Sequence, residues 1–398
     1  MNQASQTRRA RSLQRWSDRE AERIKDSFLH PQSGLSALPT PSWRSVTGLI
    51  LASVVLSGYL LIFLLGLWSV RATISAISIN PIQVAIYAFL ALMCLTFSWL
   101  ARPNFRSRDD QALTLQQVPE LYALLTEVAG LLRAPVPRIL RINGQVNAFV
   151  TREGFPPQFS LTLGLLLMFA LHPQELLDLL AHELAHEVNG DPFRGQWIAA
   201  AINVLYSLRF ALHPGSWDVG GVGTLTYGIR WLLVLPVLGL LWVFDVLLGE
   251  ASQRAEYRAD LMAASISGSE AAVSGLDKLH FADLLEFALQ KQRSNAERPH
   301  AFLELRHAWD YLKPDQWERR KAEVAQHRLR LDSSHPPTTD RIEVVRHHAL
   351  TATLTLSAER VRRIENELTP FVARIEAEAY DIFRGFWQVK RGRLTVRD

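Results

Sequence analysis

Cysteine is almost absent from this chain, which has one, Cys94, among 398 residues. A single cysteine excludes an intrachain disulfide and a metal site made of several thiolates. The sequence also lacks internal repeats and low-complexity tracts, so a repeat architecture is not expected. The protein is therefore expected in a reducing compartment, or to be indifferent to the redox state around it.

A large net charge is lacking as well, and this bears on possible partners. The net charge is +4, the isoelectric point is about 9.3, and the basic residues are not interleaved with aromatic ones. Nucleic-acid binding is therefore not expected. Residues 1–45 carry eight Arg or Lys against four acidic residues and lack the apolar core of a secretory signal. They are expected to form a polar, basic cytoplasmic arm.

Long runs without charge are what the sequence does have. Hydrophobic residues make up 48% of the chain, and no charged residue occurs between Val46 and Val70 or between Pro81 and Ala101. Each run is long enough to cross about 30 Å of hydrocarbon at about 1.5 Å per residue. A soluble metalloenzyme of this size would not bury so long an uncharged run. Residues 46–101 are therefore predicted to form a transmembrane helical hairpin.

Basic residues flank this hairpin on both sides and set its orientation. The arm before it and the segment after Arg102 are rich in Arg, whereas the link between the two runs holds only Arg71. The positive-inside rule places both flanks in the cytoplasm. We therefore expect a multi-pass protein of the cell (inner) membrane, with its N-terminus on the cytoplasmic side.

Two further apolar stretches lie at residues 196–212 and 229–248, joined by a Gly-rich link. The second is typical of a membrane span, whereas the first is borderline in length. If the residues on either side of the pair build one site, an even number of crossings must separate them. We therefore expect a second membrane hairpin over residues 196–249 and about four transmembrane helices in all.

The segments outside these apolar runs mix helical and strand patterns. Residues 102–195 combine a helical pattern at 115–132 with β-like runs at 138–142, 146–151 and 159–165. Pro173, followed by acidic residues and regularly spaced Leu, predicts the start of another helix. Residues 250–345 are helical and charged, and residues 346–398 are expected to form a helical tail. The predicted fold class is α+β, mainly helical, with a small β-sheet.

The helix predicted to start at Pro173 carries the sequence HELAH at residues 182–186. Residues four apart lie on one face of a helix, so His182 and His186 can both bind one tetrahedral zinc ion. Glu183 beside them can reach the open coordination position, where it would take a proton from the attacking water. A chance match is the alternative, because a chain with 12 His has appreciable odds of containing HExxH.

A third metal ligand must come from elsewhere in the chain, because catalytic zinc keeps three protein ligands. Glu256 is the candidate, in a helical pattern that continues the last apolar stretch. Asp260, one turn later, would accept the free N–H of a zinc-bound imidazole. The alternative is a solvated helix face on which these acids pair with Arg254 and Arg258, and the spacing alone favours that alternative.

Three motifs together resemble the HtpX-type membrane metallopeptidases, relatives of the CAAX prenyl proteases. They are LAHELAHEVNGD at residues 180–191, EYRAD at residues 256–260 and HPPTTDRI at residues 335–342. The order of elements is similar too, with an apolar hairpin before the first motif and another before the second. The likeness covers about residues 46–345. It implies a zincin-like metallopeptidase domain divided between residues 102–195 and 250–345.

The resemblance implies a role for each matching position. Glu256 would be the third zinc ligand, Asp260 would support a ligand, and Asp191 would brace the active helix. Asn147 would lie on a strand that binds the substrate backbone. Both residues have a plainer interpretation. Asp191, which precedes Pro192, could simply end a helix, and Asn147 could simply lie in a turn.

Two residues of the third motif are implied to act on the substrate. His335 would stabilise the developing oxyanion, and Arg341 would bind substrate. The alternative for both is a helix cap or a surface turn, since a His before two prolines often lies in a turn.

Together these features predict a membrane zinc endopeptidase with one Zn2+ per chain. The resemblance implies protein or peptide substrates, in particular misfolded or surplus membrane proteins, and hence protein quality control. The alternative is a catalytically inactive zinc-binding scaffold that binds partners in the same groove. Glu183 argues against a scaffold, because a structural zinc site needs no general base. The lipid bilayer is the other expected partner, and the sequence leaves the oligomeric state open.

Overall fold

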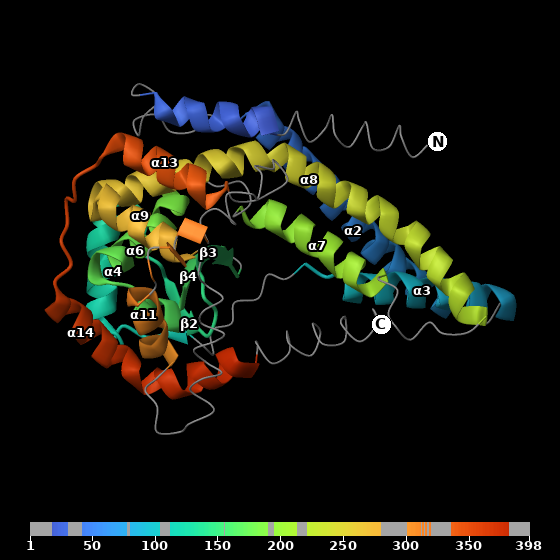
Figure 1. The fold of residues 1–398 in the computed structure, drawn as a ribbon. Coiled ribbons are helices and arrows are strands. Elements are labelled where there is room, and N and C mark those ends of the chain that lie inside the picture. Colours follow the sequence, from blue (N-terminus) through green and yellow to red (C-terminus); the bar gives the residue numbers. More distant parts are fainter. Residues whose placement is uncertain are drawn as a thin grey trace. The chain divides into compact units, whose positions relative to one another are not determined.

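The computed structural model of the protein describes residues 18–30, 42–77, 80–103, 112–154, 156–189, 195–212, 221–279, 301–311, 313, 315–316, 318–319 and 336–381. The chain divides into two compact units, whose elements are labelled in Figure 1. The sheet unit comprises Met1–Pro39, Ser107–Asp191 and Ser252–Asp398. The helical unit comprises Thr40–Arg106 and Pro192–Ala251.

The elements described in the helical unit are all helices. They are α2 (Trp43–Ala76), α3 (Pro81–Leu100), α7 (Gln196–Leu212) and the first part of α8 (Gly221–Ser267). Both helices of the first pair begin at a polar cap. The Ser42 hydroxyl accepts the backbone N–H of Ser45, and the Asn80 side-chain oxygen accepts that of Ile82. The hairpin predicted over residues 46–101 is thus formed by α2 and α3, which pack against each other.

Three helices of the described chain are long and apolar enough to cross a membrane. They are α2, α3 and the part of α8 from Gly228 onward. Only 17% of the most apolar window is buried in α2 and in α3, which suits side chains that face lipid. Helix α7 has 17 residues. At about 1.5 Å per residue it is about 26 Å long, so the predicted number of four is corrected to three candidates.

The described part of the sheet unit contains four short strands. They are β1 (Ala112–Leu113), β2 (Ile139–Asn143), β3 (Ala148–Glu153) and β4 (Gln158–Gly164), in the order β1-β2-β4-β3. β2 runs parallel to β4, and β3 runs antiparallel to β4. β2 and β4 are buried along almost their whole length, whereas burial alternates along β3, as in a strand at the edge of a sheet. The three predicted strands are confirmed to within two residues.

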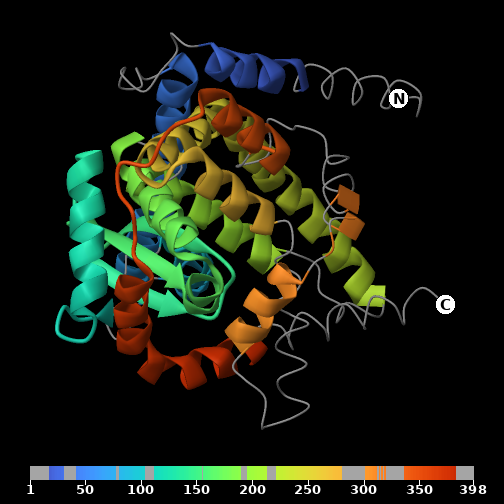
Figure 2. The same cartoon turned by 60° about the vertical axis from the view of Figure 1, so that its left-hand side comes forward.

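Helices surround the sheet and build the core with it. They are α4 (Pro119–Leu132), α5 (Leu165–Ala170), α6 (Pro173–Asn189), the end of α8, α9 (Ser269–Leu279), α11 (Ala301–Asp310), α13 (Thr338–His348), α14 (Ala358–Leu368) and η3 (Thr369–Phe371). Helix α4 packs against both α6 and α14, and α6 packs against β3 (Figures 1 and 2). The predicted α+β, mainly helical class with a small sheet is confirmed.

The C-terminal residues belong to this core. The apolar side chains of Val361, Ile364, Leu368 and Ile375 are buried in the same cluster as those of α4, α6 and the sheet. Helix α14 begins at a Ser357 cap and turns this apolar face inward. The segment predicted as a tail therefore contributes to the folded sheet unit up to the last described residues.

Candidate metal centre

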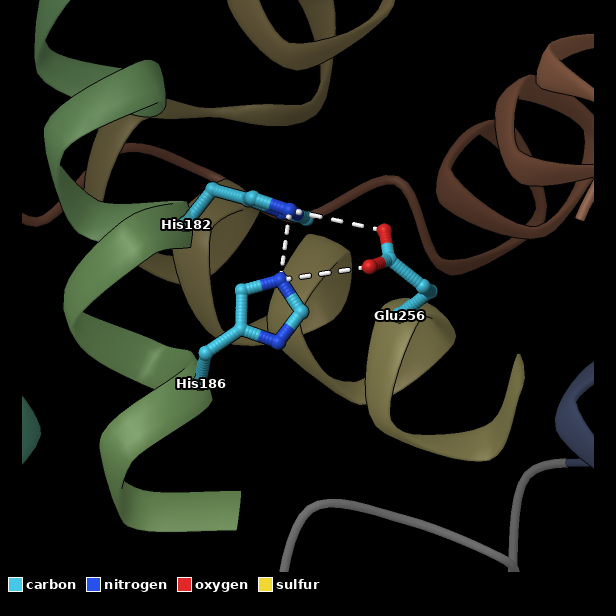
Figure 3. A group of neighbouring side chains, drawn as sticks. All are labelled: His182, His186 and Glu256. Atoms are coloured by element: carbon cyan, nitrogen blue, oxygen red, sulfur yellow. Dashed lines mark hydrogen bonds and ion pairs between the residues drawn. The ribbon is translucent and has the colours of Figure 1, made fainter. Parts of the chain in front are cut away.

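Helix α6 presents two imidazoles on one face. It begins at Pro173, a residue suited to the first helical turn, and its Leu residues at helical spacing are buried in the core. His182 and His186 lie one turn apart on this helix, with their ring centroids 4.6 Å apart. Their Nε2 atoms are 3.0 Å apart (Figure 3). Both imidazoles are thus directed at one point, the arrangement that the HExxH motif predicts.

Glu256 completes the group from helix α8 (Figure 3). Its carboxylate oxygens lie 3.6 Å from Nε2 of His182 and 3.4 Å from Nε2 of His186. Atoms bound tetrahedrally to one zinc ion at about 2.0–2.2 Å are about 3.3–3.6 Å apart. Both nitrogen–carboxylate distances fall in this range, and the two imidazole nitrogens, 3.0 Å apart, are slightly closer together. Two imidazoles and one carboxylate are the ligand types of a catalytic zinc site, which leaves a fourth position for water or substrate.

Asp260 contacts the ring nitrogen of His182 that does not face Glu256. Its Oδ1 lies 3.0 Å from Nδ1 of His182, on the side of the ring away from Glu256. An Nδ1–H donated to this carboxylate leaves the Nε2 lone pair available for a metal ion. One turn of α8 separates Asp260 from Glu256, so a single helix carries both a ligand and its support.

Arg341 in turn holds Asp260. Its Nε and Nη2 donate to the two carboxylate oxygens of Asp260 at 2.7 and 2.6 Å, a bidentate pair. Nη2 also lies 3.5 Å from Oε2 of Glu256. The expected role of Arg341 was contact with substrate, whereas the structure gives its buried guanidinium a contact with the support of the metal ligands.

The electrostatics of the group favour a cation. Burial lowers the pKa of His182, but hydrogen bonds with Asp260 and Glu256 outweigh burial and raise that pKa to about 10. Burial raises the pKa of Asp260, but the Arg341 charge and hydrogen bonds lower it on balance. Asp260 therefore stays ionised beside His182, a negative charge that a proton or a metal ion on the imidazole neutralises.

Further hydrogen bonds fix α6 against α8. Near one end of α6 the Asn189 amide donates to the backbone carbonyl of Ala255 at 3.3 Å. Near the other end Ser267 donates to the Asp178 carboxylate at 2.7 Å, and Gln174 donates to the backbone carbonyl of Ser267 at 2.9 Å. These side chains set the distance across which Glu256 meets the imidazoles. Sequence reasoning missed them, because only the fold brings the two helices together.

The remaining predicted residues are placed as follows. Glu183 lies in α6 beside His182 and is buried, with 5% of its surface exposed. Asn147 comes directly before β3 with its side chain exposed, and its backbone carbonyl accepts the N–H of Gly164. His335 and Asp191 lie outside the described residues.

The edge strand lies next to the metal-binding helix. β3 pairs with β4 on one side, and the described residues place no strand on its other side. Arg152 of β3 forms an ion pair with Glu187, the residue after His186. This contact ties the free edge of the sheet to the helix that carries both imidazoles.

Comparisons with known proteins agree with this site. The family model described as Peptidase family M48 matches residues 113–349, more than half of the chain. A Protease HtpX homolog of Gemmatimonas aurantiaca is 34% identical over 171 residues, or 41% of this chain and 57% of that protein. Protease HtpX homolog 2 of Methanosarcina mazei is 31% identical over 195 residues, or 48% of this chain and 64% of that protein.

A third relative, a Protease HtpX homolog of Paraburkholderia phytofirmans, is 28% identical over 202 residues, or 50% of this chain and 68% of that protein. The chain thus spans roughly three fifths of the length of these curated relatives. No solved structure matches it. The region matched by the family model contains His182, His186 and Glu256. The resemblance to HtpX-type proteins is confirmed, and the chain belongs to peptidase family M48.

Proposed function

We propose that the protein is a membrane-embedded, zinc-dependent endopeptidase. The observation that carries this proposal is the convergence of His182, His186 and Glu256 from two helices, with their ligand atoms within 4.8 Å of one another. Membership of peptidase family M48 supports the same activity. The donor set of two imidazoles and one carboxylate favours zinc, and it leaves an open position as catalytic sites require.

The chain supplies the proton transfers of peptide hydrolysis. A zinc ion held by the three ligands would polarise the peptide carbonyl and make a nearby water more acidic. Glu183 takes a proton from this water while the water oxygen forms a bond to the carbonyl carbon. Glu183 then gives the proton to the peptide nitrogen as the C–N bond breaks, which leaves a carboxyl group on one product and an amine on the other.

The surrounding residues orient the reacting groups. Asp260 fixes the ring of His182, and Arg341 fixes Asp260. We propose that the free edge of β3 binds the substrate backbone as an added strand, with Asn147 at the start of that edge. His335, in the motif just before α13, is proposed to stabilise the oxyanion, and Asp191 to brace the end of α6.

We propose that the substrates are protein chains in or near the lipid bilayer, such as misfolded or surplus membrane proteins. The apolar helices α2 and α3 and the HtpX homologues support a membrane location. The Arg residues on both sides of the first hairpin support an inner-membrane protein whose metal site faces the cytoplasm.

The decisive experiment replaces the proposed base. The full chain, purified in detergent, is expected to contain one zinc ion and to cleave casein. Glu183→Gln is expected to keep the zinc and lose about 10²–10⁴-fold of the cleavage rate, because general acid–base catalysis contributes about that factor. Zinc content and cleavage are measured on the same samples. Glu359→Gln makes the same chemical change at an exposed site of α14 and serves as the control.

Two outcomes would contradict the proposal. Full cleavage by Glu183→Gln would show that Glu183 is not the base. A parent protein that binds zinc but cleaves nothing under varied conditions would favour the scaffold that uses the groove to bind partners.

A further inference from the structure

The N-terminal helix, residues 18–29, lies outside the region matched by the family model, yet it packs onto the part of the fold that carries the metal site. In both views it lies alongside α13 (Figures 1 and 2). Its apolar residues Ile24 and Phe28 are buried, with 1% and 4% of their surface exposed. They form a cluster with Tyr257 and Leu261 of α8 and Val344 of α13.

Two residues of this cluster are sequence neighbours of residues in the metal site. The Phe28 ring lies 5.3 Å from that of Tyr257, which is fully buried and directly follows Glu256. Leu261 directly follows Asp260 in the same helix. The helix therefore packs on the segment of α8 that supplies the metal ligand and its support, on a face about 100° around the helix axis from those two carboxylates.

Polar contacts tie the same helix to α13. Nζ of Lys25 lies 3.6 Å from Asp340 and donates to Glu343 at 3.1 Å. Asp340 is the residue before Arg341, and its pKa is raised by burial, an effect that the Lys25 charge opposes. The side chain of Lys25 is 16% exposed, so this cation is partly shielded from water. Lys25 thus compensates a half-buried carboxylate at the start of the helix that carries Arg341.

Two further hydrogen bonds close the contact. Nη1 of Arg254 in α8 donates to the Ser27 hydroxyl at 3.3 Å. The ring nitrogen Nε2 of His348 in α13 lies 2.8 Å from the backbone carbonyl of Phe28. That carbonyl is in the last turn of the N-terminal helix, where backbone oxygens lack a partner within the helix.

The N-terminal helix therefore bridges α8 and α13, two elements that are far apart in the sequence and are joined by the ion pair of Asp260 with Arg341. We propose that this helix positions the residues of the metal centre, with Lys25 and Phe28 as its positioning residues. By holding α8 against α13, it keeps the Arg341 guanidinium on Asp260 and so keeps His182 aimed at the metal. The inference rests on the proposed zinc site but not on peptide cleavage.

The test compares two basic residues of the same helix. Lys25→Ala is expected to weaken zinc affinity about five-fold, the usual scale of one favourable ion pair, and Phe28→Ala about ten-fold or more. Arg23→Ala removes the same charge from an exposed site, where Arg23 pairs with Glu20 of the same helix, and is expected to leave zinc affinity unchanged. Zinc affinity is measured on the full chain in detergent by competition with a chelating dye. Lys25→Arg is expected to restore most of the parent affinity.

Melting temperatures separate positioning from simple stabilisation. A merely structural helix would lower the melting temperature of the zinc-free and zinc-loaded forms equally and leave zinc affinity unchanged, which would overturn the proposal. In a double-mutant cycle, Lys25→Ala and Asp340→Asn are expected to be less than additive, and full additivity would overturn the role of Lys25. If Lys25→Ala fails to fold, zinc affinity is compared for Lys25→Gln instead, because that variant keeps most of the side-chain stem and removes the charge. A loss of zinc affinity in Lys25→Ala stands even if the parent shows no peptidase activity.

Discussion

Asp260 illustrates how far the metal centre depends on side chains that do not touch the metal. Its carboxylate contacts Nδ1 of His182 on one side and accepts hydrogen bonds from Nε and Nη2 of Arg341 on the other. A buried carboxylate with so many donors stays ionised and fixed in one rotamer. The orientation of the His182 imidazole therefore depends on Arg341, which acts through Asp260 and does not itself bind the metal.

Arg341→Lys tests this chain of contacts while keeping the charge. Lysine has no planar fork and cannot bind both oxygens of Asp260 at once. We expect zinc affinity to fall about ten-fold or more, the usual effect of losing a support of a ligand. Competition with a chelating dye measures the affinity. Arg346→Lys, on the exposed side of the same helix, is the matched control, and equal affinities in the two variants would refute the prediction.

Asp178 introduces a pH dependence into the stability of the sheet unit. Burial raises its pKa from 3.8 to about 7, although the hydrogen bond from Ser267 opposes that change. Between those two pH values the folded state binds more protons than the unfolded state. Stability therefore falls as the pH rises from about 4 to about 7, and the loss is complete above pH 7.

Asp178→Asn is expected to remove this loss, because a neutral amide has no charge to bury. Its melting temperature relative to the parent should rise steadily across that pH window and stay constant at higher pH. Thermal melting of both proteins in one detergent, at several pH values, checks the prediction. A difference that does not change with pH would show that Asp178 ionises freely in the folded protein.

At the scale of elements, the edge of the sheet depends on one close backbone approach. Gly164 ends β4, and its N–H donates to the Asn147 carbonyl at 2.8 Å just before β3 begins. A Cβ atom at Gly164 would lie 2.0 Å from the carbonyl oxygen of Gln145 and 2.6 Å from that of Asn147. The loop that leads into β3 can take this course only because residue 164 has no side chain.

Gly164→Ala is therefore expected to displace the start of β3 and to destabilise the protein by about 3 kcal/mol, the upper range for overpacking. Thermal melting gives the change in stability, and cleavage of casein reports the effect on the proposed substrate edge. Gly130→Ala in α4 is the control, because a Cβ there meets nothing within 4 Å. That control is expected to be neutral or stabilising by up to about 1 kcal/mol. A neutral Gly164→Ala would count against the tight approach.

At the scale of the whole molecule, the metal site constrains how the chain crosses the membrane. His186 and Glu256 meet in one site, and the apolar stretches of α7 and α8 lie between them in the sequence. The chain must therefore cross an even number of times between those two residues. The candidate spans include α8 but not the 17-residue α7, so the even number requires either that the chain also crosses between His186 and the apolar stretch of α8 or that this stretch does not cross.

Reporter fusions test this topology. A reporter fused after Arg102 is expected to report the cytoplasm, and one fused after Leu212 distinguishes the two cases, because an outside signal there would show a crossing before α8. Cytoplasmic signal at both positions would mean that neither α7 nor α8 crosses. A reporter found outside the cell after Arg102 would reverse the proposed orientation. A fusion at the end of α8, after Ser267, is the control and should match the one at Arg102.

The sequence by itself determined the parts of this protein that depend on local pattern. The uncharged runs at residues 46–70 and 81–101 predicted α2 and α3, because length and lack of charge are sufficient for a helix in hydrocarbon. The run 182–186 predicted two metal ligands, because residues four apart share a helix face whatever the rest of the fold does. The resemblance added Glu256, which spacing alone left as a solvated residue.

Only the tertiary structure decided the contacts between segments far apart in the sequence. Helical periodicity cannot show that Arg341 reaches Asp260, that Asn189 and Ser267 fix α6 on α8, or that the basic N-terminal arm holds a helix packed on Tyr257. The physical reason is that local spacing sets which face of a helix a side chain occupies. The neighbour on that face depends on how the buried surfaces of all the helices fit together.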